Sequence, residues 1–285
     1  MTSLDGLLRA LVIEPRGTDR FGVIGEPSRF DRIFGGQSIA QALLAATATV
    51  ADQAPHSLHA YFAASGSPDE PLDIDVDRVR DGRSVSTRRV TVTQGERTIL
   101  IAMASFHENA TRPELADPPP EVPPPDQLPV LQDLVGELPP ELRRHTGSWI
   151  DQPPPLELRM AEPPTFLGGS RAQGTRSHWM RLPRDVGHDP AIHAALLAYA
   201  SDYFLLDMAF RASPELVAYT DVTATSLDHA IWFHRPVRFD RWHLHTQETL
   251  SLVGHRALVR GTIHDVDGHL VASVMQEVLV RPARG

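Results

Sequence analysis

The chain has 285 residues, no cysteine and a formal net charge of −9, and all 27 of its basic residues are arginine. An acidic protein of this kind lacks the basic face that a phosphate backbone requires, so we expect no nucleic-acid partner. The absence of cysteine excludes disulfides and thiolate chemistry, and the absence of lysine excludes Schiff-base catalysis and a P-loop lysine.

The N-terminal segment, residues 1–21, does not have the pattern of a signal peptide, because Asp5 and Arg9 interrupt its short apolar run. No apolar run in the sequence approaches the roughly 18 residues that indicate a transmembrane helix. We therefore expect a cytoplasmic protein without a membrane span.

The first half of the chain predicts one apolar helix followed by antiparallel strands. Residues 35–50 place Ile39, Ala42, Leu43 and Ala46 on one helical stripe. Apolar residues then alternate with polar ones in several runs separated by turn residues at Asp81-Gly82 and Gly95. These runs predict strands at 58–62, 72–79, 84–93 and 97–106.

A proline-rich segment divides the chain. Of the 25 prolines, 15 lie between Pro113 and Pro164, which excludes a central strand or a helix interior there. We expect an extended connector with a short helix near residues 129–138. The predicted organisation is an N-terminal domain at 1–110, a linker at 111–149 and a C-terminal domain at 150–285.

The second half repeats the order of elements. A predicted helix at 190–210 is followed by predicted strands at 228–233, 243–252, 256–266 and 269–281. His229 follows His59 by 170 residues, Gly254 follows Gly82 by 172, and Gly268 follows Gly95 by 173. Matched signatures at a nearly constant offset indicate duplication of one unit. The predicted fold class is α+β, with a long helix wrapped by an antiparallel sheet in each unit.

Asp202 is unusual because it lies in the middle of the apolar helix predicted at 190–210. Its neighbours three and four positions away cannot pair with a charge; they are Ala198, Tyr199, Leu205 and Leu206. Asp189-Pro190 already supplies the helix start, so Asp202 would lie more than three turns inside. Apolar surroundings would raise the pKa of the carboxyl group toward the range of a general base. A break at Ala200-Ser201 would instead make Asp202 a helix cap.

Other polar residues are weaker candidates. Gln276 shares one strand face with apolar residues, where its amide needs partners for catalysis or for structure. Ser226 also lies on a predicted strand and is unremarkable by itself. Gly35-Gly36 before a helix either forms a tight turn or leaves N–H groups for an oxyanion.

The histidines give no clear site from sequence. His243 and His245 lie two apart on a strand, as zinc ligands can, but no third ligand is evident, so we expect no metal. Asp228, His229 and His234 resemble an acid-base group, yet the similar His59 indicates a packing signature. We leave these residues out of the predicted catalytic set.

Five motifs together resemble the bacterial acyl-CoA thioesterase II family, whose members are double-hotdog proteins. In order they are RIFGGQSIAQAL, VRDGRSVSTRRV, YASDYFLL, LDHAIWFHRP and DGHLVASVMQE. The resemblance covers residues 20–110 and 150–281. It implies a tandem hotdog fold and hydrolysis of acyl-CoA to a free fatty acid and CoA, without a cofactor.

The resemblance also implies roles for individual residues. Asp202, Ser226 and Gln276 match the family residues that activate one water, with Ser226 where many relatives have threonine. Independently of the resemblance, we expect Gly36 and Gln37 at the start of the first helix to contribute to substrate binding, because backbone N–H groups and an amide can donate to a carbonyl oxygen. The resemblance further implies a homo-oligomer, a dimer or tetramer of double hotdogs. The alternatives are a non-catalytic acyl-CoA-binding protein and a hotdog hydratase or dehydratase.

Overall fold

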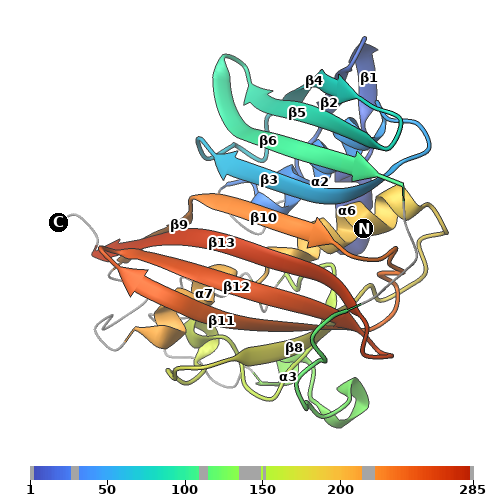
Figure 1. Ribbon diagram of the computed structural model, residues 1–285. Coiled ribbons are helices and arrows are strands. Elements are labelled where there is room, and N and C mark those ends of the chain that lie inside the picture. Colours follow the sequence, from blue (N-terminus) through green and yellow to red (C-terminus); the bar gives the residue numbers. More distant parts are fainter. Residues whose placement is uncertain are drawn as a thin grey trace.

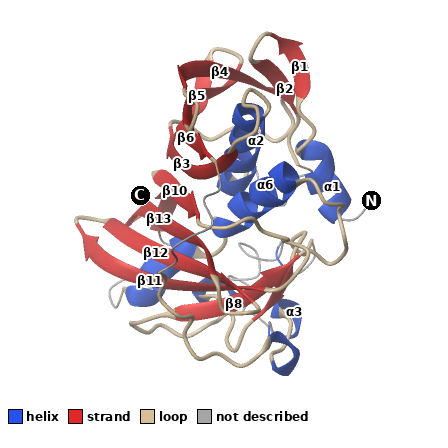
Figure 2. Ribbon diagram, turned by 45° about the vertical axis from the view of Figure 1, so that its right-hand side comes forward, coloured by secondary structure: helices blue, strands red, loops and turns tan. Residues whose placement is uncertain are grey.

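The computed structural model describes residues 3–26, 32–108, 115–134, 149, 152–213 and 222–282. These residues form one continuous antiparallel sheet of 13 strands, with the longer helices packed on one face (Figures 1 and 2). In order across the sheet the strands are β1 (Glu14–Gly17), β2 (Arg20–Val23), β4 (Leu72–Asp81), β5 (Val85–Gln94), β6 (Arg97–His107), β3 (Ala54–Phe62), β10 (Asp228–Phe233), β13 (Leu270–Pro282), β12 (Arg256–Asp265), β11 (His243–Val253), β8 (Arg176–Arg181) and β7 (Glu157–Arg159), with β9 (Val222–Ser226) beside β13.

The two halves of the sheet repeat one strand order. Reading outward from the centre, the first half has β3, β6, β5 and β4, and the second has β10, β13, β12 and β11. The halves meet where β3 pairs antiparallel with β10, with Ala60 opposite His229 and Leu58 opposite Ile231. The predicted duplication is therefore visible as two equivalent sheets that join into one. The strands at its edges, β1, β2, β7 and β8, were not predicted.

Helix α2 (Gly35–Thr47) is the central helix of the first half. It packs against β3, β4, β5 and β6, and every residue from Gly36 to Ala46 is buried. Its alanine-rich sequence fits this position, because small side chains allow close approach of a second helix on one side and of the sheet on the other. The predicted helix at 35–50 is confirmed, with its end at Thr47.

The single helix predicted at 190–210 is wrong. The structure has two helices, α6 (Pro190–Ser201) and α7 (Leu205–Ala212), separated at Asp202–Phe204. Phe204 has a left-handed backbone (φ 67°), which ends one helix and redirects the chain. The break lets α6 pack against α2, while α7 packs against β11, β12 and β13. One straight helix cannot cover both surfaces.

The predicted linker, at its described residues 115–134, packs against the second half of the sheet. Within its described residues, η1 (Pro125–Gln127) and α3 (Leu131–Leu134) are short helical turns. Leu128 packs with Trp179 and Leu244, and Trp179 Nε1 donates to the carbonyl oxygen of Pro123 at 2.9 Å. The predicted boundaries at 110/111 and 149/150 adjoin residues outside the described part and stay predictions.

Two short elements complete the fold. Helix α1 (Ser3–Ala10) adds Leu4 and Leu7 to the main core, and the turn η2 (Thr165–Leu167) adds Phe166. Among the helices of the described residues, none is long and apolar enough to span a membrane.

Candidate active site

A cavity of about 440 Å³ lies where the two halves meet. It is bounded by the start of α2, the break between α6 and α7, and the end of β9. Its lining combines apolar and aromatic side chains with polar ones, and Asp202 and Ser226 are among the polar ones. The wall includes Phe34, Phe62, Trp149, Phe166, Tyr203 and Phe204. The cavity therefore combines an apolar chamber with two of the predicted catalytic residues.

Asp202 lies at the C-terminal end of α6 and faces the N-terminal end of α2. Its Oδ2 accepts a hydrogen bond from the backbone N–H of Gly36 at 2.8 Å, and the residue is 8% exposed. Burial raises the pKa of the carboxyl group to about 7, because an ionised carboxylate loses hydration there. The hydrogen bonds from Gly36 and Gln276 lower the pKa and only partly offset this effect. A carboxyl group in this range can accept a proton near neutral pH.

Gln276 and Ser226 are hydrogen-bonded to each other beside Asp202. Gln276 Nε2 donates to Ser226 Oγ at 2.7 Å, and Gln276 is fully buried on β13. Ser226 is the last residue of β9 and lies opposite Val278. Asp228, which the sequence raised as an acid-base candidate, accepts a hydrogen bond from the backbone N–H of Glu277 at 2.6 Å. This contact fixes the strand next to Gln276.

The structure thus brings together all three residues of the predicted catalytic set, from α6, β9 and β13. It also adds a residue that the sequence reasoning excluded. His229 Nδ1 lies 2.6 Å from Gln276 Oε1 and 3.9 Å from Asp202 Oδ1. The ring is fully buried, and burial lowers its pKa to about 4, so the ring is neutral.

The reason for excluding His229 was wrong. His59 is exposed on β3, whereas Leu58 and Ala60 on either side of it are buried. His229 is buried on β10 and stands opposite Ala60. Side chains alternate between the two faces of a strand. If the offset between the two halves is wrong by one residue, an outward side chain such as His59 is paired with an inward one such as His229. Burial alternates along β10 in the structure, but residues 230–233 are all apolar, so the sequence carried no alternation that could have distinguished His229 from His59.

The structure gives Gly36 and Gln37 structural contacts. The Gly36 N–H is bonded to Asp202, so it serves the carboxylate and is not free for a substrate oxygen. Gln37 is buried; its Oε1 accepts from the N–H of Glu26 at 3.0 Å and its Nε2 donates to Gln41 at 3.3 Å. Neither residue lines the cavity, although the neighbouring Gly35 does.

The two histidines considered as zinc ligands are both buried on β11. His243 Nδ1 donates to the carbonyl oxygen of Arg241 at 2.9 Å. The ring of His245 lies against that of His178, with centroids 5.1 Å apart, and burial lowers the pKa of His245 to about 3. In the described part of the chain, neither belongs to a group of three potential metal ligands.

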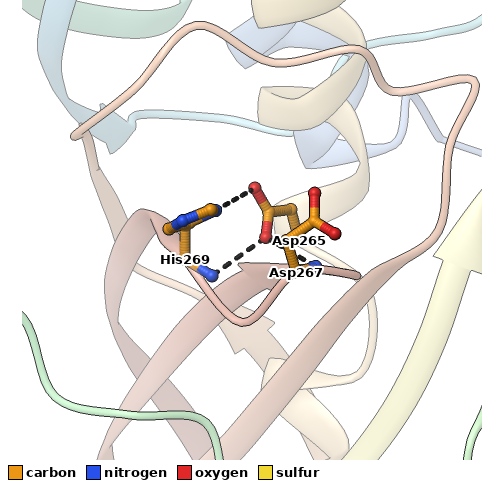
Figure 3. A group of neighbouring side chains, drawn as sticks. All are labelled: Asp265, Asp267 and His269. Atoms are coloured by element: carbon orange, nitrogen blue, oxygen red, sulfur yellow. Dashed lines mark hydrogen bonds and ion pairs between the residues drawn. The ribbon is translucent and has the colours of Figure 1, made fainter.

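One such group lies at the turn between β12 and β13 (Figure 3). Asp265 Oδ1 accepts from the backbone N–H groups of Asp267 and His269, at 3.0 and 2.9 Å, and Oδ2 faces His269 Nδ1 at 3.2 Å. These contacts close the hairpin turn in the way that aspartate commonly does. They account for the group without a metal.

Comparison with known proteins matches both halves of the chain. A family model described as the acyl-CoA thioesterase N-terminal domain matches residues 26–107, and one described as acyl-CoA thioesterase matches residues 154–279. Acyl-coenzyme A thioesterase 8 of Mus musculus is 34% identical, over 88% of this chain and 80% of that protein.

Solved structures agree with this match. Acyl-CoA thioesterase II TesB2 from Mycobacterium marinum is 33% identical, with a TM-score of 0.79 over 98% of this chain and 99% of that chain. A protein of unknown function with a hotdog fold from Alicyclobacillus acidocaldarius is 21% identical, with a TM-score of 0.74 over 98% of both chains, and shares the fold. The chain therefore belongs to the acyl-CoA thioesterase family and has the α+β tandem hotdog fold that the resemblance implied.

Proposed function

We propose that this protein hydrolyses acyl-CoA to a free fatty acid and CoA, with Asp202 as the general base. The observation that carries the proposal is the position of Asp202: a buried carboxyl group at the cavity wall, with a pKa of about 7, beside a serine and a glutamine. The relatives with thioesterase names support the reaction class.

The geometry supports a mechanism without a covalent intermediate. Asp202 takes one proton from a water, and the resulting hydroxide attacks the carbonyl carbon of the thioester. The tetrahedral intermediate then collapses, the carbon–sulfur bond breaks, and CoA leaves as a thiolate. General-base catalysis typically contributes about 10²- to 10⁴-fold, so positioning must supply part of the rate.

Ser226 and Gln276 provide that positioning. Ser226 Oγ accepts a hydrogen bond from Gln276, so its own proton is directed to a second partner in the cavity. A water bound there lies between the hydroxyl group and Asp202. The aromatic wall of the cavity suits an acyl chain, because burying apolar surface is favourable by roughly 25 cal/mol per Å².

The contacts of His229 argue against a hydratase. Hydratases need a side chain that moves protons to and from the acyl chain. Both ring nitrogens of His229 already have partners, Gln276 Oε1 and Ser201 Oγ, and the ring is neutral. A non-catalytic acyl-CoA-binding protein would not need a carboxyl group of raised pKa at the cavity wall.

The test is release of free thiol from a panel of acyl-CoA substrates by the parent and by Asp202→Asn. The amide has nearly the same shape and still accepts from Gly36, but it cannot take a proton. We expect turnover to fall at least about 100-fold, with the fold intact by circular dichroism. Turnover within about threefold of the parent would remove Asp202 from the role of base.

Asp207 provides a matched control, because it is a second buried aspartate at the cavity wall. Its carboxylate is paired with Arg176 at 2.6 Å and accepts from the N–H groups of Thr165 and Phe166. We expect Asp207→Asn to lower thermal stability and to leave most turnover of the folded enzyme.

We also propose that the protein is a cytoplasmic homo-oligomer, a dimer or tetramer. On the outer face of the sheet, Tyr61 and Ile101 lie opposite each other and Met103 lies beside them, with exposed fractions of 69%, 46% and 40%. An exposed apolar group of this kind favours contact with a second copy. Analytical ultracentrifugation of the parent and of Tyr61→Arg tests this, and a parent monomer would contradict it.

A further inference from the structure

His229 is fixed by hydrogen bonds on both sides of its ring. On one side, Nδ1 lies 2.6 Å from Gln276 Oε1. On the other side, Nε2 lies 2.9 Å from Ser201 Oγ, whose oxygen is also 2.8 Å from the carbonyl oxygen of Ala198. The groups form a continuous series, Ser201, His229, Gln276 and Ser226, that ends at the cavity.

The direction of the hydrogen bonds follows from the orientation of the amide. Gln276 Nε2 donates to Ser226, so its Oε1 faces the ring and must accept. His229 therefore carries its proton on Nδ1. Its Nε2 is then an acceptor, and the hydroxyl proton of Ser201 is shared between Nε2 and the Ala198 carbonyl.

A glutamine amide has almost the same shape after a 180° flip, so packing alone cannot select its orientation. A flipped Gln276 would place its NH2 group against the Nδ1–H of His229 and its carbonyl oxygen near the Asp202 carboxylate. Both contacts are repulsive. The observed orientation instead puts the NH2 group toward Ser226 and Asp202.

The first half of the protein provides an internal comparison. The inward residues of β3 and of its partner strand β6 are apolar there; they include Leu58, Ala60, Ala102 and Ala104. His229 and Gln276 occupy the corresponding inward faces of β10 and β13. The same sheet therefore forms in the first half with apolar residues on these faces, which favours a role beyond packing for the two polar groups in the second half.

We propose that His229 is a positioning residue for the hydrolysis: through Nδ1 it holds the Gln276 amide with its NH2 group toward Ser226 and Asp202. Ser201, the residue directly before the base, holds the other side of the ring through its contact with Nε2, so the end of α6 supplies both Asp202 and a hydroxyl group that fixes His229. His229 does not touch the substrate and does not exchange protons with it. This inference rests on the proposed function of Asp202.

The main test compares His229→Leu with His229→Asn. Leucine is tolerated on the inward face of β3 but has no donor, whereas the asparagine amide can still donate to Gln276. We expect His229→Leu to lower kcat by about tenfold or more with KM within about twofold, and His229→Asn to recover most of the loss. His59→Leu is the matched control, because His59 lies on the exposed face; it should retain the turnover of the parent.

The pH dependence of activity distinguishes a positioning role from a structural one, because loss of packing alone would not shift the acid limb. Donation from Gln276 lowers the pKa of Asp202, so freeing the amide should raise that pKa. Among the described residues, Asp202 and His229 face each other, and His245 lies behind His229 and is neutral. The other charged groups around the cavity are Arg32 and the ion pair of Asp207 with Arg176. We expect the acid limb of kcat/KM to move to higher pH in His229→Leu and to return toward its original position in His229→Asn.

The double variant separates positioning from stability. If His229 acts through Gln276, then His229→Leu should change kcat less than about twofold in a Gln276→Ala background. Multiplicative losses, or a folded His229→Leu with the kcat and pH profile of the parent, would overturn the inference. If His229→Leu does not fold, Ser201→Ala tests the same series of bonds, and an unchanged acid limb there overturns the inference. Asp202→Asn measured in parallel keeps the two proposals distinct, since full activity in that variant refutes the proposed function itself.

Discussion

Asp202 accepts a hydrogen bond from the backbone N–H of Gly36 at 2.8 Å, across 166 residues of sequence. The carboxylate comes from the end of α6 in the second half, and the donor comes from the first turn of α2 in the first half. The N-terminal end of a helix carries a partial positive charge that favours a carboxylate. The two duplicated units therefore both contribute to one candidate active site.

This relationship predicts the pH dependence of activity. Asp202 must be ionised to act as a base, and burial raises its pKa to about 7. We expect kcat/KM to increase with pH through about 7 and to level off above it. Steady-state kinetics from pH 5 to 9 would measure this, and an acid limb near pH 4 would mean that the base is a carboxyl group with an ordinary pKa.

Stability should depend on pH through the same residue. The folded pKa of Asp202 is about 7, above the value near 4 in the unfolded chain, so the unfolded state ionises first as pH rises. The stability of the parent should fall between pH 4 and 7. Asp202→Asn lacks this effect. The free energy of unfolding of the variant minus that of the parent should therefore increase by about 2–3 kcal/mol between pH 5 and 8. Urea unfolding at both pH values measures the difference; a constant difference would argue against a raised pKa.

The two glycines that begin α2 should differ in their response to alanine. A Cβ at Gly36 would lie 2.3 Å from the backbone oxygen of Tyr199, which cannot move without shifting α6. A Cβ at Gly35 would lie 2.8 Å from Asp202 Oδ2, a side-chain atom. We expect Gly36→Ala to lower Tm by about 5 °C or more and Gly35→Ala to reduce turnover with a smaller change in Tm. Thermal melts and thiol release on both variants test this, and equal stabilities would contradict it.

Replacing Gln41 should affect mainly stability, whereas replacing Gln276 should affect mainly turnover. Gln41 is fully buried, and its Nε2 donates to the carbonyl oxygens of Ala10 and Ile24, so it fastens α1 and the segment after β2 to α2. Gln276 instead orients Ser226. We expect Gln41→Ala to lower stability by about 1–3 kcal/mol, with kcat of the folded enzyme retained. Gln276→Ala should depress kcat strongly, and the reverse pattern would place the active water in the first half.

The sequence by itself determined the four main strands of each half and the duplication. Alternation of apolar and polar residues at 72–79, 84–93, 256–266 and 269–281 identified strands that the structure confirms, because the two faces of a strand meet different surroundings. The family motifs also selected Asp202, Ser226 and Gln276, which the structure brings together in one site.

Only the tertiary structure decided the break after α6. Residues 200–205 are all compatible with a helix, so local preference does not reveal the left-handed Phe204. The break arises because α6 packs on α2 while α7 packs on β11–β13, and these surfaces do not lie on one line.

Comparison of sequence motifs likewise could not identify the role of His229. Its likeness to His59 is real in sequence, but the two side chains face opposite sides of the joined sheet. Which face a side chain occupies depends on strand register, and register is set by contacts between strands far apart in the chain. The same reason explains Gly36: its N–H belongs to the first half, and only the packing of α6 on α2 brings Asp202 to it.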